Sequence, residues 1–217
     1  MQTLMGNFVH EVLECMYKAF EPGDRTLLEA NNLCRQLWNT GAWEERVAPY
    51  LGSTKLSEFR WMSWWCIENL FQLEEPSIIT PAGVECEVLG ELNGVRIKGY
   101  IDRWGVVDGV AKITDYKTGK TPSKRYMDGK FFQLTLYAAM LQLETDFDSY
   151  ELELLYLKDG VRLSGLAAPK DISEVVNVVT NVKEQINQSY DNNDWKAIPS
   201  KLCDWCIYKK TICTYWN

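Results

Sequence analysis

The chain has 217 residues, of which 46% are hydrophobic and 24% are charged, a composition typical of a soluble globular protein with a sizeable core. No apolar run approaches the roughly 20 residues that cross a bilayer, and the first residues lack the basic and apolar segments of a secretory signal. We therefore expect a cytoplasmic protein without a membrane partner.

The formal net charge of −7 at pH 7 disfavours nucleic acid as a partner, because phosphate binding relies on Lys and Arg. The distribution of charge points the other way, since residues 111–130 contain six basic side chains and only two acidic ones. Such a strip suits a polyanionic substrate, and it suits a solvated loop about as well.

The first 75 residues predict a helical lobe. Apolar residues recur at three- and four-residue steps over residues 4–20, 27–38 and 55–73, which is the pattern of amphipathic helices. Asp24 follows a Pro-Gly break and is expected to cap the second helix. The last helix is dense in aromatic side chains, which we expect to fill the core between helices, although such rings can also stack on the bases of single strands.

The pattern changes to strands after residue 76. Residues 84–92, 95–103 and 110–116 are strand-like, and the dipeptides Asn93-Gly94 and Asp108-Gly109 between them favour two-residue hairpins. These segments predict a three-stranded antiparallel meander.

Further elements complete an α+β fold. A helix is expected over residues 127–143, a second hairpin over 150–158 and 161–165, and a regular helix over 172–186. We expect one integrated domain with three parts, namely a helical N-terminal lobe, an α+β core and a C-terminal cysteine segment, which span residues 1–75, 76–190 and 191–217.

Two acids and a lysine meet at the centre of the predicted sheet. Asp115 and Lys117 are two residues apart in one strand and project to the same face, and the hairpin can bring Asp102 beside them. Two carboxylates and a backbone carbonyl, that of Tyr116, suit Mg²⁺ or Mn²⁺. The alternative is a surface ion pair, which Ile113 disfavours because this apolar residue shares the face.

The order of these motifs resembles the PD-(D/E)xK nuclease superfamily, and within it the branch of the RecB nuclease domain and the CRISPR-associated RecB-like exonucleases. The resemblance rests on four elements in the expected order: Gly6 to His10, Gly99-Tyr100-Ile101-Asp102-Arg103, Asp115-Tyr116-Lys117, and Gln133 to Tyr137. It implies a restriction-endonuclease-like core and a metal-dependent nuclease.

The resemblance also implies roles for individual residues. His10 and Glu85 would join Asp102, Asp115 and Tyr116 around the metal, whereas without the resemblance His10 is a core residue of an apolar helix and Glu85 an exposed strand position. Lys117 would orient or deprotonate the attacking water, or stabilise negative charge in the transition state. Gln133 and Tyr137 lie one helical turn apart and would contact the substrate backbone or hold the site's geometry, although periodicity alone places Tyr137 in the core.

Three of the seven cysteines, Cys203, Cys206 and Cys213, cluster near the C-terminus at a spacing that suits zinc or an iron–sulfur cluster. The resembling nucleases add one upstream cysteine to hold a [4Fe–4S] cluster, and no cysteine precedes Gly6 here. Cys15 or Cys34 could substitute, a non-cysteine ligand could serve, the chain as given could lack its natural start, or the thiols could be free.

The leading hypothesis is a metal-dependent deoxyribonuclease, an exonuclease that acts on DNA ends or single strands in recombination, repair or replication. The alternative is a catalytically silent DNA-binding module that keeps the nuclease fold, which the acidic net charge and the incomplete cysteine set favour mildly. A third hypothesis, a protein-interaction scaffold formed by the Trp-rich helices, has no specific residue pattern behind it.

Overall fold

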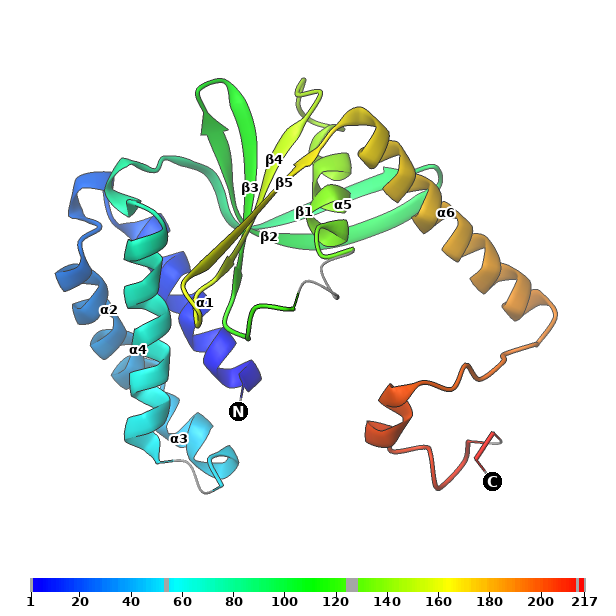
Figure 1. Cartoon of the computed structure of the whole chain (residues 1–217), viewed down its shortest axis with the longest axis horizontal. Helices are drawn as coiled ribbons and strands as arrows, with labels where there is room; N and C mark the ends of the chain where they lie inside the picture. The colour runs from blue at the N-terminus through cyan, green and yellow to red at the C-terminus, as the bar shows by residue number, and fades with distance from the viewer. Residues whose placement is uncertain (1, 53–54, 124–128, 214, 217) are drawn as a thin grey trace. The chain divides into compact units, whose positions relative to one another are not determined.

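The computed structural model describes residues 2–52, 55–123, 129–213 and 215–216 (Figure 1). The chain divides into two compact units, Met1–Asn177 and Val178–Asn217. The boundary lies inside helix α6, Pro169–Asp191, so the division expected at residues 75 and 190 stays a prediction. No helix in the described ranges combines the length and the hydropathy that a bilayer span requires.

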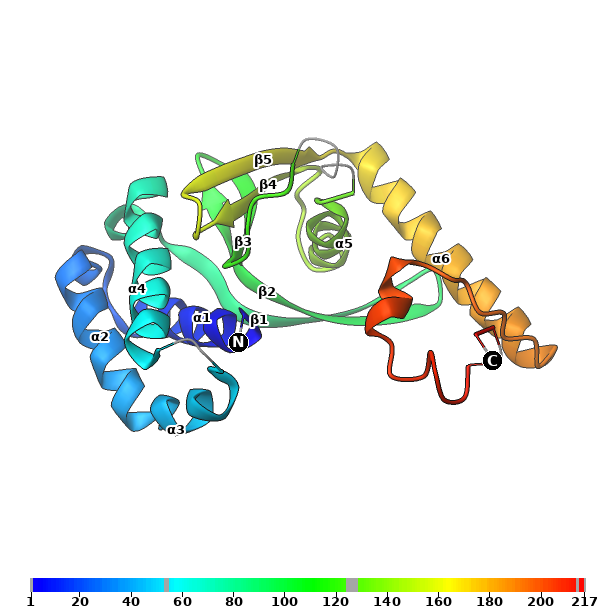
Figure 2. The ribbon, with the colours of Figure 1, turned by 60° about the horizontal axis from the view of Figure 1, so that its bottom comes forward.

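The first unit opens with helices that lie side by side, as Figure 2 shows. The α-helices are α1 Gln2–Ala19, α2 Leu27–Thr40, α3 Trp43–Val47 and α4 Leu56–Leu73, with 3-10 turns at Pro22–Asp24, Ala48–Tyr50 and Pro76–Ile78. The expected cap of α2 is wrong: Asp24 lies in a 3-10 turn begun by Pro22, and the Thr26 side chain accepts the hydrogen bond from Glu29 N.

The aromatic residues of α4 do not all fill the core. Phe59 is fully buried, but Trp61 and Trp65 are exposed and stack on each other, with ring centroids 5.6 Å apart and planes 22° from parallel. The expectation of core packing is wrong for these two residues, because positions i and i+4 share a helix face and this face of α4 is exposed.

A five-stranded mixed sheet follows and confirms the α+β class. Its strands run in the order β1-β2-β3-β4-β5, and only the β3–β4 pair is parallel. The strands are β1 Pro81–Leu92, β2 Val95–Val107, β3 Val110–Lys117, β4 Tyr150–Tyr156 and β5 Val161–Ala167. Both hairpins of the predicted meander form, with Asn93-Gly94 and Asp108-Gly109 at the positive φ angles that such turns require. The hairpin predicted over 150–158 and 161–165 also forms, as β4 and β5.

Helix α5, Phe132–Leu141, connects the two parallel strands and packs on one face of the sheet (Figure 1). It is shorter than the expected 127–143. Gly129 has a φ of +73°, which is incompatible with a right-handed helix, so the helix begins after it. Met127 and Asp128 lie outside the described residues.

Two hydrophobic clusters hold the first unit together. One joins α1, α2 and α4 to the sheet through Tyr116, Leu155 and Leu157. The other joins α5 to the opposite part of the sheet through Leu134, Ile101 and Leu154. Because α1 and α5 pack on the sheet independently, side chains from both helices can reach the ends of β2 and β3.

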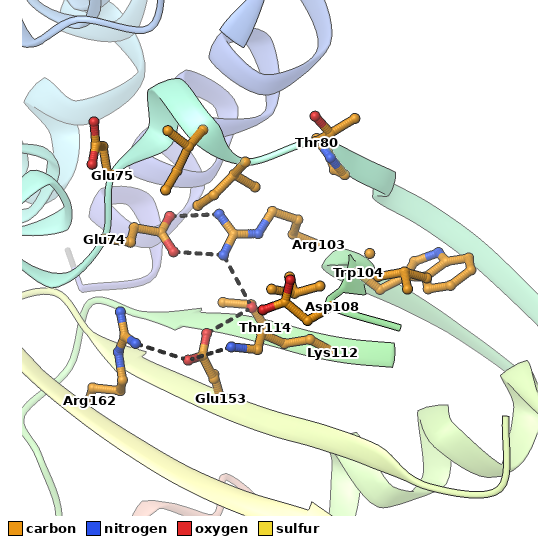
Figure 3. A pocket seen from close by; sticks show the side chains of 16 residues that line it. Glu74, Glu75, Thr80, Arg103, Trp104, Asp108, Lys112, Thr114, Glu153 and Arg162 are labelled. Atoms are coloured by element: carbon orange, nitrogen blue, oxygen red, sulfur yellow. Dashed lines mark hydrogen bonds and ion pairs between the residues drawn. The ribbon is translucent and has the colours of Figure 1, made fainter. Parts of the chain in front are cut away.

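A buried ion pair lies beside a cavity of about 500 Å³ that Figure 3 draws. The Arg103 guanidinium donates to both oxygens of Glu74 at 2.6 Å, and each side chain is only 5% exposed. Arg103 also donates to the Tyr17 hydroxyl at 2.6 Å and to Thr114 Oγ1 at 3.2 Å, and Thr114 donates to Glu153 at 3.3 Å. The network therefore ties β2 and β3 to α1 and to the end of α4.

Strand β1 contains a distortion at Glu85. Val84 pairs with Arg103 and Cys86 pairs with Ile101, while Glu85 between them has a left-handed φ of +43°. A non-glycine residue in this region is strained, and such strain is typical of functional positions.

We expect Arg103→Met to lower the free energy of unfolding by about 3–5 kcal/mol, because it leaves the Glu74 carboxylate buried without its partner. The matched control is Lys98→Met, which removes the cation of a solvent-exposed pair with Glu87 and should leave the unfolding free energy nearly unchanged. Urea unfolding measures both, and equal losses would contradict a structural role for the buried pair.

At position 85 we expect the Gly variant to be more stable than the Ala variant by about 1 kcal/mol, because only glycine adopts the left-handed φ without strain. Both variants lack the carboxylate, so their difference isolates the backbone. At Glu87, whose φ is not positive, the order should reverse. Thermal unfolding of the four variants checks this, and a more stable Ala variant at position 85 would refute the strain.

Candidate metal centre

The paired register of β2 and β3 stops at Arg103 and Thr114. Beyond it the Asp102 side chain takes the place of a backbone acceptor: Tyr116 N donates to Asp102 Oδ2 at 2.7 Å. This hydrogen bond holds one carboxylate oxygen, and the other, Oδ1, lies 3.7 Å from His10 Nδ1. Asp102 is thereby fixed between the two strands with one oxygen directed toward α1.

His10 on α1 faces three oxygen-bearing groups. Its Nδ1 lies 3.1 Å from Glu85 Oε1 and its Nε2 lies 3.0 Å from the carbonyl oxygen of Tyr116. In the described ranges, one trio of metal-capable side chains brings its ligand atoms within 4.8 Å of one another, and it consists of His10, Glu85 and Asp102. Helix α1 supplies one of these groups, and the distant β1–β2 hairpin supplies the other two, one from each strand.

Asp115 and Lys117 lie on β3 beside this trio. Lys117 Nζ donates to Asp115 Oδ1 at 2.8 Å and lies 2.7 Å from Oδ2, and the Asp115 side chain is 6% exposed. Oδ2 is buried and accepts no hydrogen bond of normal geometry from a described residue. The Lys117 ammonium therefore neutralises this buried carboxylate as an ion pair, as an ionised acid away from water requires.

The electrostatics of the site favour a bound cation. Burial and the charge of Asp115 raise the pKa of Asp102 to about 7, and burial raises the pKa of Asp115 although Lys117 opposes it. Burial lowers the pKa of His10, but the hydrogen bond to Glu85 and the charges of Asp102 and Glu85 outweigh it and raise that pKa to about 9. Both ring nitrogens face acceptors, a pattern that only the imidazolium satisfies with two N–H donors.

Two glycines of the sequence motifs mark close approaches. A Cβ on Gly99 would lie 2.5 Å from Cε1 of Tyr137, so the tyrosine ring packs directly on the β2 backbone. A Cβ on Gly6 would lie 3.3 Å from Thr118 Oγ1, where α1 passes the segment after β3. Glycine at these positions lets α5 and α1 approach the strands that carry Asp102 and Lys117.

Gln133 and Tyr137 form a pair of which one member lines the site. Gln133 Nε2 donates to the Tyr137 hydroxyl at 2.7 Å. Gln133 lines the same cavity, of about 710 Å³, as His10 and Lys117, whereas Tyr137 is buried in the core cluster under α5. Tyr137 thus holds the Gln133 amide in place through this hydrogen bond.

Further polar residues of α1 line this cavity. Asn7, Glu11 and Glu14 follow one another at steps of four and three residues and line the cavity with His10. Helical periodicity measured from His10 could have identified Asn7 and Glu14. Glu11 Oε2 accepts from Trp43 Nε1 at 3.0 Å, and Glu14 accepts from Lys18 at 2.6 Å, so each has a partner outside the trio.

The basic strip expected over residues 111–130 does not act as one surface. Lys112 points to the opposite face of β3 from Lys117 and pairs with Glu151 at 3.1 Å and Glu153 at 3.5 Å. Lys120 and Lys130 are exposed, and Lys124, Arg125 and Asp128 lie outside the described residues.

The three C-terminal cysteines belong to the second unit. Within it, Cys206 N donates to Cys203 O at 3.2 Å, and the Cys203 sulfur accepts from Ser200 N at 3.4 Å. The thiols of Cys203, Cys206 and Cys213 do not form a trio of the kind found around His10 in the described residues. A zinc or iron–sulfur site at these residues stays a prediction.

Two curated relatives carry the name Gene 69 protein. That of Mycobacterium phage L5 is 27% identical over 146 residues, which cover 65% of this chain and 47% of the relative. That of Mycobacterium phage D29 is 43% identical over 63 residues, which cover 28% of this chain and 21% of the relative. The chain therefore spans about half, or less, of the length of these relatives.

A solved structure titled "Crystal structure of SSO0001" aligns with 99% of this chain and 96% of its own, at 15% identity and a TM-score of 0.43. The family profile described as PD-(D/E)XK nuclease superfamily matches residues 1–214. This match spans the helices, the sheet and the residues around His10, Asp102 and Lys117. The chain belongs to the PD-(D/E)XK nuclease superfamily.

Proposed function

We propose that the chain is a divalent-metal-dependent deoxyribonuclease of the RecB-like branch, which acts as an exonuclease on DNA ends or single strands during recombination, repair or replication. The observation that carries the proposal is the convergence of His10, Glu85 and Asp102 beside the Asp115–Lys117 pair. Membership of the nuclease superfamily supports phosphodiester hydrolysis as the reaction and DNA as the substrate.

Mg²⁺ or Mn²⁺ would be held by oxygens of Asp102, Asp115 and Glu85, by the Tyr116 carbonyl and by one nitrogen of His10. When bound, such an ion lowers the pKa of water and offsets the negative charge of the phosphodiester. Hard divalent cations prefer oxygen ligands, and this set supplies them from three neighbouring strands. Asp115 Oδ2 accepts no hydrogen bond of normal geometry and lies 2.7 Å from Lys117 Nζ, so the ammonium and a bound ion would both neutralise this carboxylate.

Lys117 acts as a cation in this proposal. Burial lowers its pKa, but the charge of Asp115 and their hydrogen bond outweigh burial and raise the pKa above its ordinary value. A lysine in this state is a poor base at neutral pH. Of the roles considered for it, stabilisation of negative charge and orientation of water are therefore favoured over proton abstraction.

Gln133 takes a positioning role toward the substrate backbone. Its amide is held at 2.7 Å by the Tyr137 hydroxyl, and the Tyr137 ring is in turn held against Gly99 in the strand that carries Asp102. A substrate phosphate next to the metal would thus contact the Gln133 amide. Strand β2 positions this amide through Gly99 and Tyr137, and the same strand carries the metal ligand Asp102.

We expect Mn²⁺ to bind more tightly as the pH rises from 6 to 8, by about tenfold per pH unit, because the cation must displace a proton from His10 and metal ligands bind in their deprotonated form. With the pKa of His10 at about 9, the proton is present throughout this range. Protonation of Asp102, whose pKa is about 7, steepens the dependence below pH 7. Isothermal titration calorimetry of the full chain measures it.

The variant His10→Gln should bind Mn²⁺ more weakly and lose the pH dependence above pH 7. Glu91→Gln removes an exposed carboxylate at the other end of β1 and should behave as the wild type. An affinity of the wild type that does not change with pH, or equal loss in both variants, would contradict the proposed ligands.

We expect Lys117→Ala to lower the rate of DNA hydrolysis by about 100-fold or more, while Mn²⁺ binding persists because the carboxylates remain. The matched control is Lys112→Ala on the opposite face of β3, which should keep the wild-type rate. Linear single-stranded, linear duplex and circular single-stranded DNA serve as substrates with Mg²⁺ or Mn²⁺, and an exonuclease should spare the circle.

Equal hydrolysis by wild type and Lys117→Ala would mean that a contaminant causes it. DNA that binds in EDTA and is never cleaved under any metal condition would favour the alternative of a silent DNA-binding module.

A further inference from the structure

A small pocket opens between α2 and α4, on the helical part of the first unit. Its volume is about 230 Å³, below the roughly 300–1,000 Å³ of drug-sized ligand sites. Its lining residues are Phe8, Asn31, Cys34, Arg35, Trp38, Arg60, Trp61 and Trp64. Phe8, Cys34 and Trp38 are buried and form an apolar floor, so the pocket suits one flat ring with a polar group at its edge.

Trp61 stands at the rim of this pocket with an accessible ring, since the residue is 60% exposed. On the same face of α4, Trp61 stacks on Trp65, with the two ring centroids 5.6 Å apart. Trp65 is anchored in turn, because its Nε1 donates to the carbonyl of Lys158 at 3.1 Å. A large exposed indole that is held in place by a second indole is a preformed surface for stacking.

Two arginines give the pocket a positive charge in a chain whose net charge is −7. Arg35 and Arg60 are exposed, and no described carboxylate forms an ion pair with either of them. The Arg60 guanidinium lies over the Trp38 ring, 5.3 Å from its centroid. The lining contains no acidic residue, in contrast to the acid-rich metal centre, so the pocket attracts an anion.

The stacking surface is connected to the proposed metal centre through the turn between β4 and β5. Trp65 and Asn69 donate to carbonyls of this turn, Asn69 to Leu157 O at 2.8 Å. The same turn reaches the β3 end, because Leu157 N donates to Lys117 O at 2.8 Å. Lys117 and the Trp65 side chain are therefore hydrogen-bonded to the same turn, one through its backbone and the other through its indole.

We propose that this pocket binds one nucleotide of a single-stranded DNA substrate, with its base stacked on Trp61 and its phosphate held by Arg35 and Arg60. A nucleotide combines a flat ring with an anion. The lining of this pocket offers an aromatic surface for the ring and two arginines for the anion. Single strands rather than duplexes fit, because only unpaired bases present a free face. The choice of DNA as the ligand rests on the proposed function.

The test measures binding of a fluorescent 12-residue oligothymidylate to the full chain in EDTA, where the metal-dependent reaction is stopped. Trp61→Ala should weaken binding by about 5- to 100-fold, the range that removal of one base–aromatic stack produces. Trp61→Phe should restore most of the loss, because it keeps an aromatic face. The matched control is Trp195→Ala in the second unit, a residue that is 61% exposed and should bind as the wild type.

The arginines are tested through salt dependence. Arg60→Gln and Arg35→Gln should each weaken binding and reduce the slope of log affinity against log salt by about one. Arg96→Gln makes the same change in net charge at the β1–β2 hairpin and should alter neither value. Wild-type affinity in Trp61→Ala and Arg60→Gln, or an equal loss in the Trp195→Ala and Arg96→Gln controls, would overturn the proposal.

A second measurement separates this pocket from the metal centre. The pocket and the metal centre share no lining residue, and bis(p-nitrophenyl) phosphate carries a single phosphate, so Trp61→Ala should hydrolyse it at the wild-type rate. A wild type that hydrolyses no substrate but binds the oligonucleotide through Trp61 would remove the nuclease proposal and support the pocket. If the wild type hydrolyses DNA and Trp61→Ala binds the oligonucleotide as tightly as the wild type does, the nuclease proposal is supported and the pocket proposal is refuted.

Discussion

Two neighbouring carboxylates, the half-buried Asp102 on β2 and the buried Asp115 on β3, impose the constraint on which the rest of the structure depends. Like charges at short range repel, and removal from water makes each of them more costly. The surrounding groups offset this cost: the backbone N–H of Tyr116 and the imidazole of His10 for Asp102, and the ammonium of Lys117 for Asp115. A divalent cation would complete the compensation.

The opposite side of β2 and β3 carries the counterpart of this arrangement. Arg103 follows Asp102 and Thr114 precedes Asp115, so the alternation of side chains in a strand directs both away from the acids. There they form one hydrogen-bonded network with Glu74 and Tyr17. Because Tyr17 is on the same helix as His10, the network that fixes the two strands also fixes the helix that supplies the imidazole.

Helix α1 connects the two sites discussed for this protein. One of its faces carries His10 and lines the acidic cavity, and Phe8 on another face forms part of the floor of the Arg- and Trp-lined pocket. The first concentrates negative charge, which suits a cation, and the second concentrates positive charge and aromatic surface, which suits a nucleotide. A net charge summed over the chain conceals this separation.

Local periodicities and turn dipeptides determined the order of the elements, the α+β class and the pairing of Asp115 with Lys117 on one face, because these depend on neighbours a few residues away. Only the tertiary structure decided that Arg103 pairs with Glu74 and that Trp61 faces solvent. It also decided the left-handed φ of Glu85. Those features follow from how α1, α4 and the sheet pack together. Contacts between segments that are distant in the sequence produce no regular spacing of residue types, so sequence periodicity does not predict them.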